Sequence, residues 1–217
     1  MATEHFIDSS GGVRIAAYEE GNPDGPTVVL VHGWPDSHVV WDSVAPLLAD
    51  RFRIIRYDNR GVGRTTAPRR VADHTMARYA DDFGAVIDAL APGQRVHVLA
   101  HDWGSAGVWE YLARPEAEDR IASFTSVSGP SGDHLARYVL DGLAAPYRPR
   151  RFLRSLTQLL RLSYMGFFSI PVLAPLLVRG VLSKALRRSL QLRDGVPADR
   201  LYHSVTFAAD AARSIKV

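Results

Sequence analysis

An aspartate placed at the end of an apolar run is the residue of this chain best suited to chemistry. Residues 98–105 read VLAHDWGS, so the run ends at Asp102 and small residues surround it, namely Ala100, Gly104 and Ser105. A chain that leaves a buried strand and enters a helix this sharply needs small neighbours and presents one side chain alone. A carboxylate presented there could attack an electrophilic carbon and form an ester with the enzyme. The competing interpretation is that Asp102 only caps the N-terminus of a helix.

A second turn could supply hydrogen-bond donors to the same point. The apolar segment 27–31, TVVLV, runs into HGWPDS at residues 32–37, which contains Gly and Pro. If this turn lies beside Asp102, the backbone N–H groups of Trp34 and Trp103 could converge on a developing negative charge. The sequence therefore predicts an oxyanion hole made by Trp34 and Trp103. A third turn, DNRGVGR at residues 58–64, is expected to be structural, with its Asp and Arg side chains bracing the loop.

Together these turns resemble the signatures of one enzyme family. HGWP at 32–35, DNRGVG at 58–63 and HDWG at 101–104 are similar to the H-G-x-P, D-x-R-G-x-G and H-D-W-G motifs of epoxide hydrolases of the α/β-hydrolase fold. The similarity is closest to the N-terminal half of bifunctional actinobacterial proteins, in which such a domain precedes a short-chain dehydrogenase domain. No Gly-rich dinucleotide fingerprint follows a strand in these 217 residues, so we expect that fused domain to be absent here.

The elements that must position these turns predict an α/β fold. Strand-like runs at 6–8, 13–18, 27–31, 52–57, 95–100 and 121–128 are separated by helical patterns at 39–48, 76–90 and 105–113. Such alternation indicates a mostly parallel sheet with helices on both faces, and the first two strands are expected to form a hairpin at the sheet edge. We predict a hydrolase core at residues 1–132 with six strands, an incomplete helical cap at 133–217, and the last strands of the fold missing.

The predicted cap contains a candidate proton donor. Residues 163–171, SYMGFFSIP, match the W-Y-x-x-x-F-Q-x-P-like cap motif of epoxide hydrolases at Tyr, Phe and Pro, and depart from it at the first and seventh positions. The resemblance implies that Tyr164 donates a hydrogen bond to the epoxide oxygen during ring opening; packing within the cap is its alternative role. The apolar stretch 161–179 has two prolines and a glycine inside it, which favour short cap helices over a membrane span and leave a contact with a membrane surface open.

The same resemblance implies a catalytic acid and a histidine base on loops that follow the cap. Only His134 and His203 follow Asp102, and both fall in the predicted cap, while His32 and His101 lie inside the motifs, where such residues brace loops. Asp133 is a weaker candidate for the acid. We therefore expect a fragment of a hydrolase domain that forms an ester at Asp102 but does not turn over.

Composition limits the other functions. The chain is 47% apolar, has no Cys and carries a net charge of +3, which is typical of a single globular domain in a reducing cytoplasm. No signal peptide, no metal-ligand spacing, no cofactor motif and no basic nucleic-acid patch are recognised, so the expected partner is a small hydrophobic epoxide. Two alternatives remain: a noncatalytic remnant that binds an apolar ligand or a partner, and a haloalkane dehalogenase, which also uses an Asp nucleophile followed by Trp.

Overall fold

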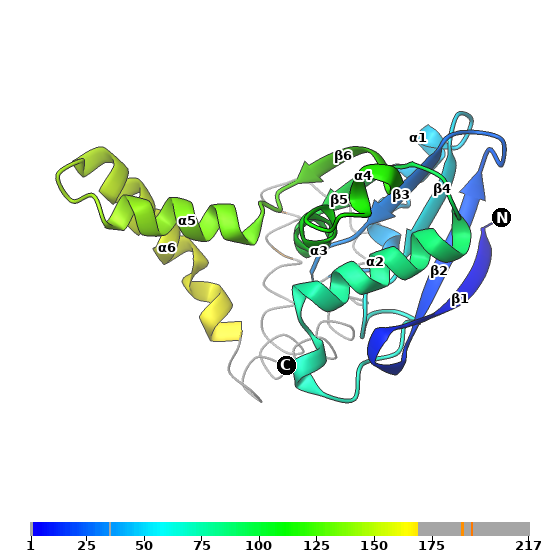
Figure 1. The fold of residues 1–217 in the computed structure, drawn as a ribbon, viewed down its shortest axis with the longest axis horizontal. Helices are drawn as coiled ribbons and strands as arrows, with labels where there is room; N and C mark the ends of the chain where they lie inside the picture. The colour runs from blue at the N-terminus through cyan, green and yellow to red at the C-terminus, as the bar shows by residue number, and fades with distance from the viewer. Residues whose placement is uncertain (1, 35, 169–187, 189–191, 193–217) are drawn as a thin grey trace.

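The computed structural model describes residues 2–34, 36–168, 188 and 192 (Figure 1). Six strands form one sheet in the order β1-β2-β4-β3-β5-β6. They are β1 Thr3–Ser9, β2 Val13–Gly21, β3 Thr27–Val31, β4 Arg53–Tyr57, β5 Val96–His101 and β6 Ile121–Val127. The β1–β2 and β2–β4 pairs are antiparallel, and the β4–β3, β3–β5 and β5–β6 pairs are parallel. The predicted mostly parallel sheet, with a hairpin at its edge, is confirmed.

Helices cover both faces of the sheet, which explains why β3 is buried at every position and apolar from Val28 to Val31. Val29 and Val31 face one core, which α2 (Met76–Leu90) and α3 (Trp103–Leu112) complete. Val28 and Leu30 face a second core with Trp41 and with α1 (Ala45–Leu48). Because side chains alternate along a strand, a strand buried on both faces needs an uninterrupted apolar run.

The helix predicted over residues 39–48 is wrong as a single element. The structure has a 3-10 turn at His38–Trp41 followed by the short helix α1. Pro46 stands at the start of α1, and because proline has no N–H it cannot continue the hydrogen-bond ladder from the preceding turn. Two further 3-10 turns, Ser10–Gly12 and Val71–Asp73, and the short helix α4 (Ala117–Arg120) lie in connections.

The chain beyond β6 leaves the sheet as a helical hairpin. The helices α5 (Gly132–Leu143) and α6 (Pro149–Phe168) pack against each other and project away from the sheet at the end of β6 (Figure 1). Gly142 allows this contact, since an added Cβ there would lie only 1.8 Å from Ser155 Oγ. Within the described residues, no helix is long and apolar enough to cross a bilayer. Most of the apolar stretch 161–179 lies outside the described residues.

Candidate active site

Asp102 occupies a strained turn between β5 and α3. Its backbone has φ 49° and ψ −120°, a positive φ that non-glycine residues rarely adopt and that costs about 1–3 kcal/mol. Two hydrogen bonds hold the turn: Asp102 N–H donates to Val127 O at 2.9 Å, and Ala106 N–H donates to Asp102 O at 3.1 Å. The strain is therefore maintained by the neighbouring strand β6 and by the first turn of α3.

Three glycines clear the space that this turn needs. An added Cβ would lie 2.3 Å from His32 O at Gly104, 2.5 Å from Asp102 Cβ at Gly33, and 2.3 Å from Asp102 O at Gly129. The local sequence predicts Gly104 as a small neighbour of Asp102, but it does not predict that Gly33 and Gly129 approach Asp102. Each of these two follows a strand next to β5, and a glycine at the carboxyl end of a neighbouring parallel strand is the signal that could have identified both.

The Asp102 carboxylate does not cap α3, although Asp102 is its N-cap residue. Instead, its Oδ2 accepts a hydrogen bond from Trp34 N–H at 3.0 Å. The parallel pairing of β3 with β5 sets Val31 opposite Ala100, which brings the two following turns together. Trp103 is the first residue of α3, so its N–H has no carbonyl partner within the helix. The capping interpretation is not supported, and the carboxylate faces the turn after β3.

His32 is a buried brace beneath this turn. Its Nδ1 lies 2.8 Å from Gly33 O and its Nε2 accepts the Asn59 N–H at 2.9 Å, so the ring carries its proton on Nδ1. Asn59 Nδ2 also donates to His32 O at 2.7 Å. Burial lowers the pKa of His32, which keeps the imidazole neutral. The turns after β3 and β4 are thereby tied to each other.

Asp58 ties the same two turns a second time. Its Oδ1 accepts the His38 N–H at 3.0 Å and lies 2.7 Å from His38 Nδ1, and its Oδ2 accepts from Tyr18 Oη and Arg64 N–H, both at 3.2 Å. The Tyr18 ring stacks on His38 with ring centroids 3.8 Å apart. Burial opposes ionisation of Asp58, but the bonds from His38 outweigh it and lower the pKa of this carboxyl.

The expected brace between Asp58 and an arginine side chain of its loop is wrong for Arg60. The Arg60 guanidinium turns toward α2, where its Nε and Nη2 donate to the two carboxylate oxygens of Asp82, each at 2.7 Å. It also donates to the carbonyl oxygens of Asp73 and Arg78. Both side chains of the Arg60–Asp82 pair are fully buried, which requires this complete pairing. Asp82 directly precedes Phe83, which belongs to the apolar pattern of α2. An acid beside a residue of the buried face is the sequence signal that could have indicated a buried partner for a basic side chain.

The remaining candidates are not gathered around Asp102. Asp133 and His134 are exposed in the first turn of α5. The backbone of Tyr164 lies in α6, but its side chain lies outside the described residues, as does His203. No group of three or more metal-binding side chains is found within the described part of the chain.

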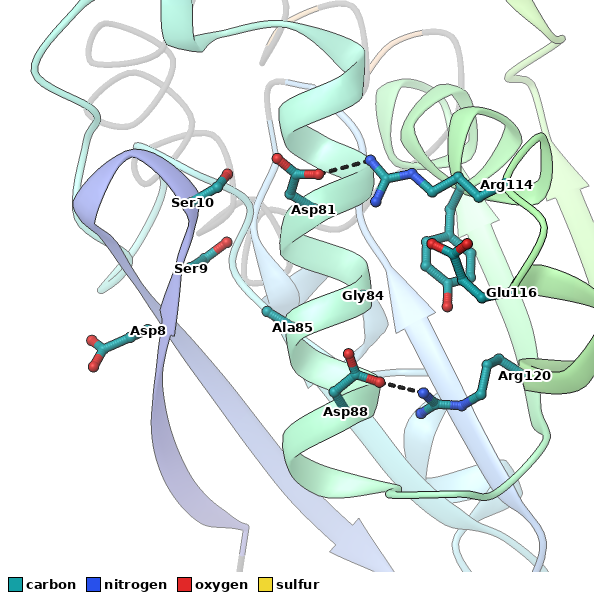
Figure 2. A pocket seen from close by; sticks show the side chains of 11 residues that line it. Asp8, Ser9, Ser10, Asp81, Gly84, Ala85, Asp88, Arg114, Glu116 and Arg120 are labelled. Atoms are coloured by element: carbon teal, nitrogen blue, oxygen red, sulfur yellow. Dashed lines mark hydrogen bonds and ion pairs between the residues drawn. The ribbon is translucent and has the colours of Figure 1, made fainter.

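A cavity of about 540 Å³ opens elsewhere, between β1, α2 and the segment from α3 to α4. Figure 2 shows that its charged walls pair with one another, Asp81 with Arg114 and Asp88 with Arg120. Asp102 and the residues of the turn after β3 do not line it. Because its principal charges are mutually neutralised and no activated nucleophile faces it, we assign it no catalytic role.

Residues 26–215 match the family described as alpha/beta hydrolase fold. A protein of Mycobacterium tuberculosis named probable oxidoreductase EphD is 66% identical over 211 residues, which are 97% of this chain and 36% of that protein. Epoxide hydrolase A of the same species is 32% identical over 130 residues, covering 59% of this chain and 39% of that protein. The chain thus spans little more than a third of the length of these relatives.

Solved structures of low sequence identity share the fold. The epoxide hydrolase VrEH1 from Vigna radiata has a TM-score of 0.71 at 21% identity, over 99% of this chain and 71% of that one. Epoxide hydrolase A from Mycobacterium thermoresistibile has a TM-score of 0.68 at 18% identity, over 100% of this chain and 74% of that one. At such identities the likeness establishes the fold and leaves the activity to be argued from the site.

Proposed function

Because this chain belongs to the α/β-hydrolase fold family and has epoxide hydrolases among its relatives, we propose that it opens an apolar epoxide by attack of the Asp102 carboxylate. One observation carries the proposal. The carboxylate stands in a strained turn, leaves the helix start uncapped, and is bound through Oδ2 by Trp34 N–H. Strained, pre-oriented side chains of this kind are typical of nucleophiles.

The hydrogen bond to Oδ2 suggests which oxygen attacks. Asp102 Oδ1 would form a bond to a ring carbon while the carbon–oxygen bond of the ring breaks and its electron pair moves to the epoxide oxygen. That oxygen takes a proton, for which Tyr164 is the proposed donor by resemblance. Oδ2 then becomes the carbonyl oxygen of the ester, already bound by Trp34 N–H.

Hydrolysis of the ester would use the same donors. Attack of water on the ester carbon moves negative charge onto Oδ2, and the N–H groups of Trp34 and Trp103 are the proposed oxyanion hole. The step also needs a base. The His38–Asp58 pair stands at the end of β4, two strands from β5 and thus about 10 Å across the sheet, which is too far to activate a water at Asp102. Among the described residues this pair therefore does not supply the base, and an ester that forms without a base in reach should persist.

The name of the EphD relative suggests oxidoreductase chemistry for that protein. The 211 residues aligned with that protein make up 97% of this chain and so include most of residues 26–215, which match the hydrolase family. Hydrolytic rather than redox chemistry is therefore what we propose for these residues.

Intact-mass measurement after incubation with styrene oxide tests the proposal. We expect one added epoxide mass, mapped by peptide digestion to Asp102, and no adduct in Asp102→Asn. Asp141→Asn, at an exposed acid of α5 with no expected role in the reaction, is the matched control and should label like the wild type. Equal labelling of Asp102→Asn and the wild type would refute a nucleophilic Asp102. Release of halide from a bromoalkane with no reaction toward epoxides would favour the dehalogenase alternative.

A further inference from the structure

The outer side of α6 carries exposed leucines on one face. Leu153, Leu156 and Leu160 follow a spacing of three and four residues, which places them on one side of a helix. Leu153 is 57% exposed and Leu160 is 65% exposed, while the opposite side of α6 buries Ser155 against Gly142 of α5. The described fold therefore leaves this leucine face, defined by these three residues, in contact with solvent.

Arginines border the leucine face. The sequence of α6 contains four arginines and no Asp or Glu. Arg151 forms an ion pair with Asp141 of α5, with 3.7 Å between Arg151 Nη2 and Asp141 Oδ2. The other three, Arg150, Arg154 and Arg161, are exposed, and within the described residues no ion pair involves them. At 100° per residue, these three project from the flank of the helix next to the leucine face.

We propose that α6 docks on the surface of a bilayer that contains anionic phospholipid. Its leucine face would enter the boundary between headgroups and acyl chains, and Arg150, Arg154 and Arg161 would bind lipid phosphates. An apolar face bordered by cations that form no ion pair with the described residues complements this surface, which offers apolar depth and negative charge together. The long arginine side chains can reach outward to the phosphates while their methylene groups lie along the apolar region. The proposal is independent of the activity of Asp102.

Vesicle flotation with the full 217-residue chain tests the proposal. We compare vesicles of equal parts phosphatidylglycerol and phosphatidylcholine with vesicles of phosphatidylcholine alone. The wild type should float with the anionic vesicles and lose most of that binding in 0.5 M NaCl, roughly as expected for screened charges. Replacing the three leucines by Gln should reduce binding at least about tenfold. Replacing Arg150, Arg154 and Arg161 by Gln should remove the preference for anionic vesicles.

Matched controls separate this surface from general stickiness. Leu47→Gln changes a leucine that is 81% exposed on α1, and Arg69→Gln with Arg70→Gln removes two exposed charges outside α6. These variants should bind like the wild type. Absence of wild-type binding to anionic vesicles, or an equal loss in the controls, would overturn the proposal.

A second measurement detects contact with the membrane directly and does not rely on variants that bind less tightly. Because the chain has no natural Cys, a single Cys at position 156 or 160 can carry a nitrobenzoxadiazole dye. The dye should brighten and shift to the blue on anionic vesicles at Leu156→Cys and Leu160→Cys, and should not change at Leu47→Cys. An unchanged dye at positions 156 and 160, or binding to an acidic protein in place of vesicles, would show that the leucine face serves another partner.

Discussion

The turn around Asp102 and the α5–α6 hairpin are built in opposite ways. In the turns after β3 and β4, which support Asp102, the buried side chains of His32 and Asp58 have several partners each. On the hairpin, by contrast, large apolar side chains such as Leu140 and Leu160 are exposed, and its ion pairs lie in solvent. The first region fixes one geometry for a reactive group, whereas the second leaves apolar surface available for binding.

The strained backbone of Asp102 needs the rigid surroundings that the first region provides. A strained conformation that costs about 1–3 kcal/mol is retained only if several independent contacts of the surrounding structure hold it in place. The ties from His32 to Asn59 and from Asp58 to His38 fix the turn that carries Trp34. A turn placed on the hairpin would have no comparable support.

The largest effect should come from breaking the buried pair. Asp82→Asn leaves the Arg60 charge buried without its carboxylate, and we expect a loss of about 3–5 kcal/mol in the free energy of unfolding, measured by urea denaturation. Asp141→Asn, which removes the acid of the exposed pairs with Arg137 and Arg151, should cost less than about 0.5 kcal/mol. Similar losses in the two variants would contradict the contrast between the regions.

Glycine substitutions should give a smaller difference of the same kind. Gly104→Ala puts a methyl group 2.3 Å from His32 O, so backbone must move, and we expect a loss of about 1–3 kcal/mol despite the better helix propensity of Ala. Gly132→Ala, at the start of α5, meets no atom within 4 Å and should be neutral or slightly stabilising. Thermal melting of the two variants decides, and an unchanged Gly104→Ala would show that the turn is more adaptable than this geometry implies.

Sequence patterns predicted the parts of the fold that depend on local periodicity. The two-sided burial of β3 and the 15-residue helix α2 follow from apolar spacing. Gly104 was identified because it neighbours Asp102 in the chain. Asp82 and Gly129 were not, since their partners are 22 and 27 residues away and depend on which strands lie together. The direction of the Arg60 side chain was likewise not encoded in its own loop.

The pH dependence of stability should also distinguish the regions. Burial places the pKa of His32 below the ordinary value of 6.5, so below that pH the unfolded chain binds a proton that the folded chain does not. The contribution of neutral His32 to the free energy of unfolding is therefore fully present above about pH 6.5. It is lost as the pH decreases, by at most about 1.4 kcal/mol per pH unit for one group.

Unfolding measured between pH 7.5 and 5.5 tests this expectation. His74, whose pKa is also lowered by burial, adds to the same slope, so the difference between wild type and His32→Asn isolates His32. His32→Asn should be less stable throughout but less dependent on pH. Leu47→Gln, which changes an exposed side chain of α1 and no titratable group, should retain the wild-type slope. The same slope in all three proteins would show that His32 does not titrate on unfolding.

The smallest effect should come from the leucine face. Leu153→Ala and Leu160→Ala remove side chains that are mostly in water, so the free energy of unfolding should change by less than about 0.5 kcal/mol. Leu30→Ala removes a fully buried side chain of β3 and should cost about 2–5 kcal/mol. Urea denaturation in the absence of lipid measures all three variants. If Leu153→Ala or Leu160→Ala approached the cost of Leu30→Ala, another part of the chain would have to cover the leucine face, and that face would not be free to bind a membrane.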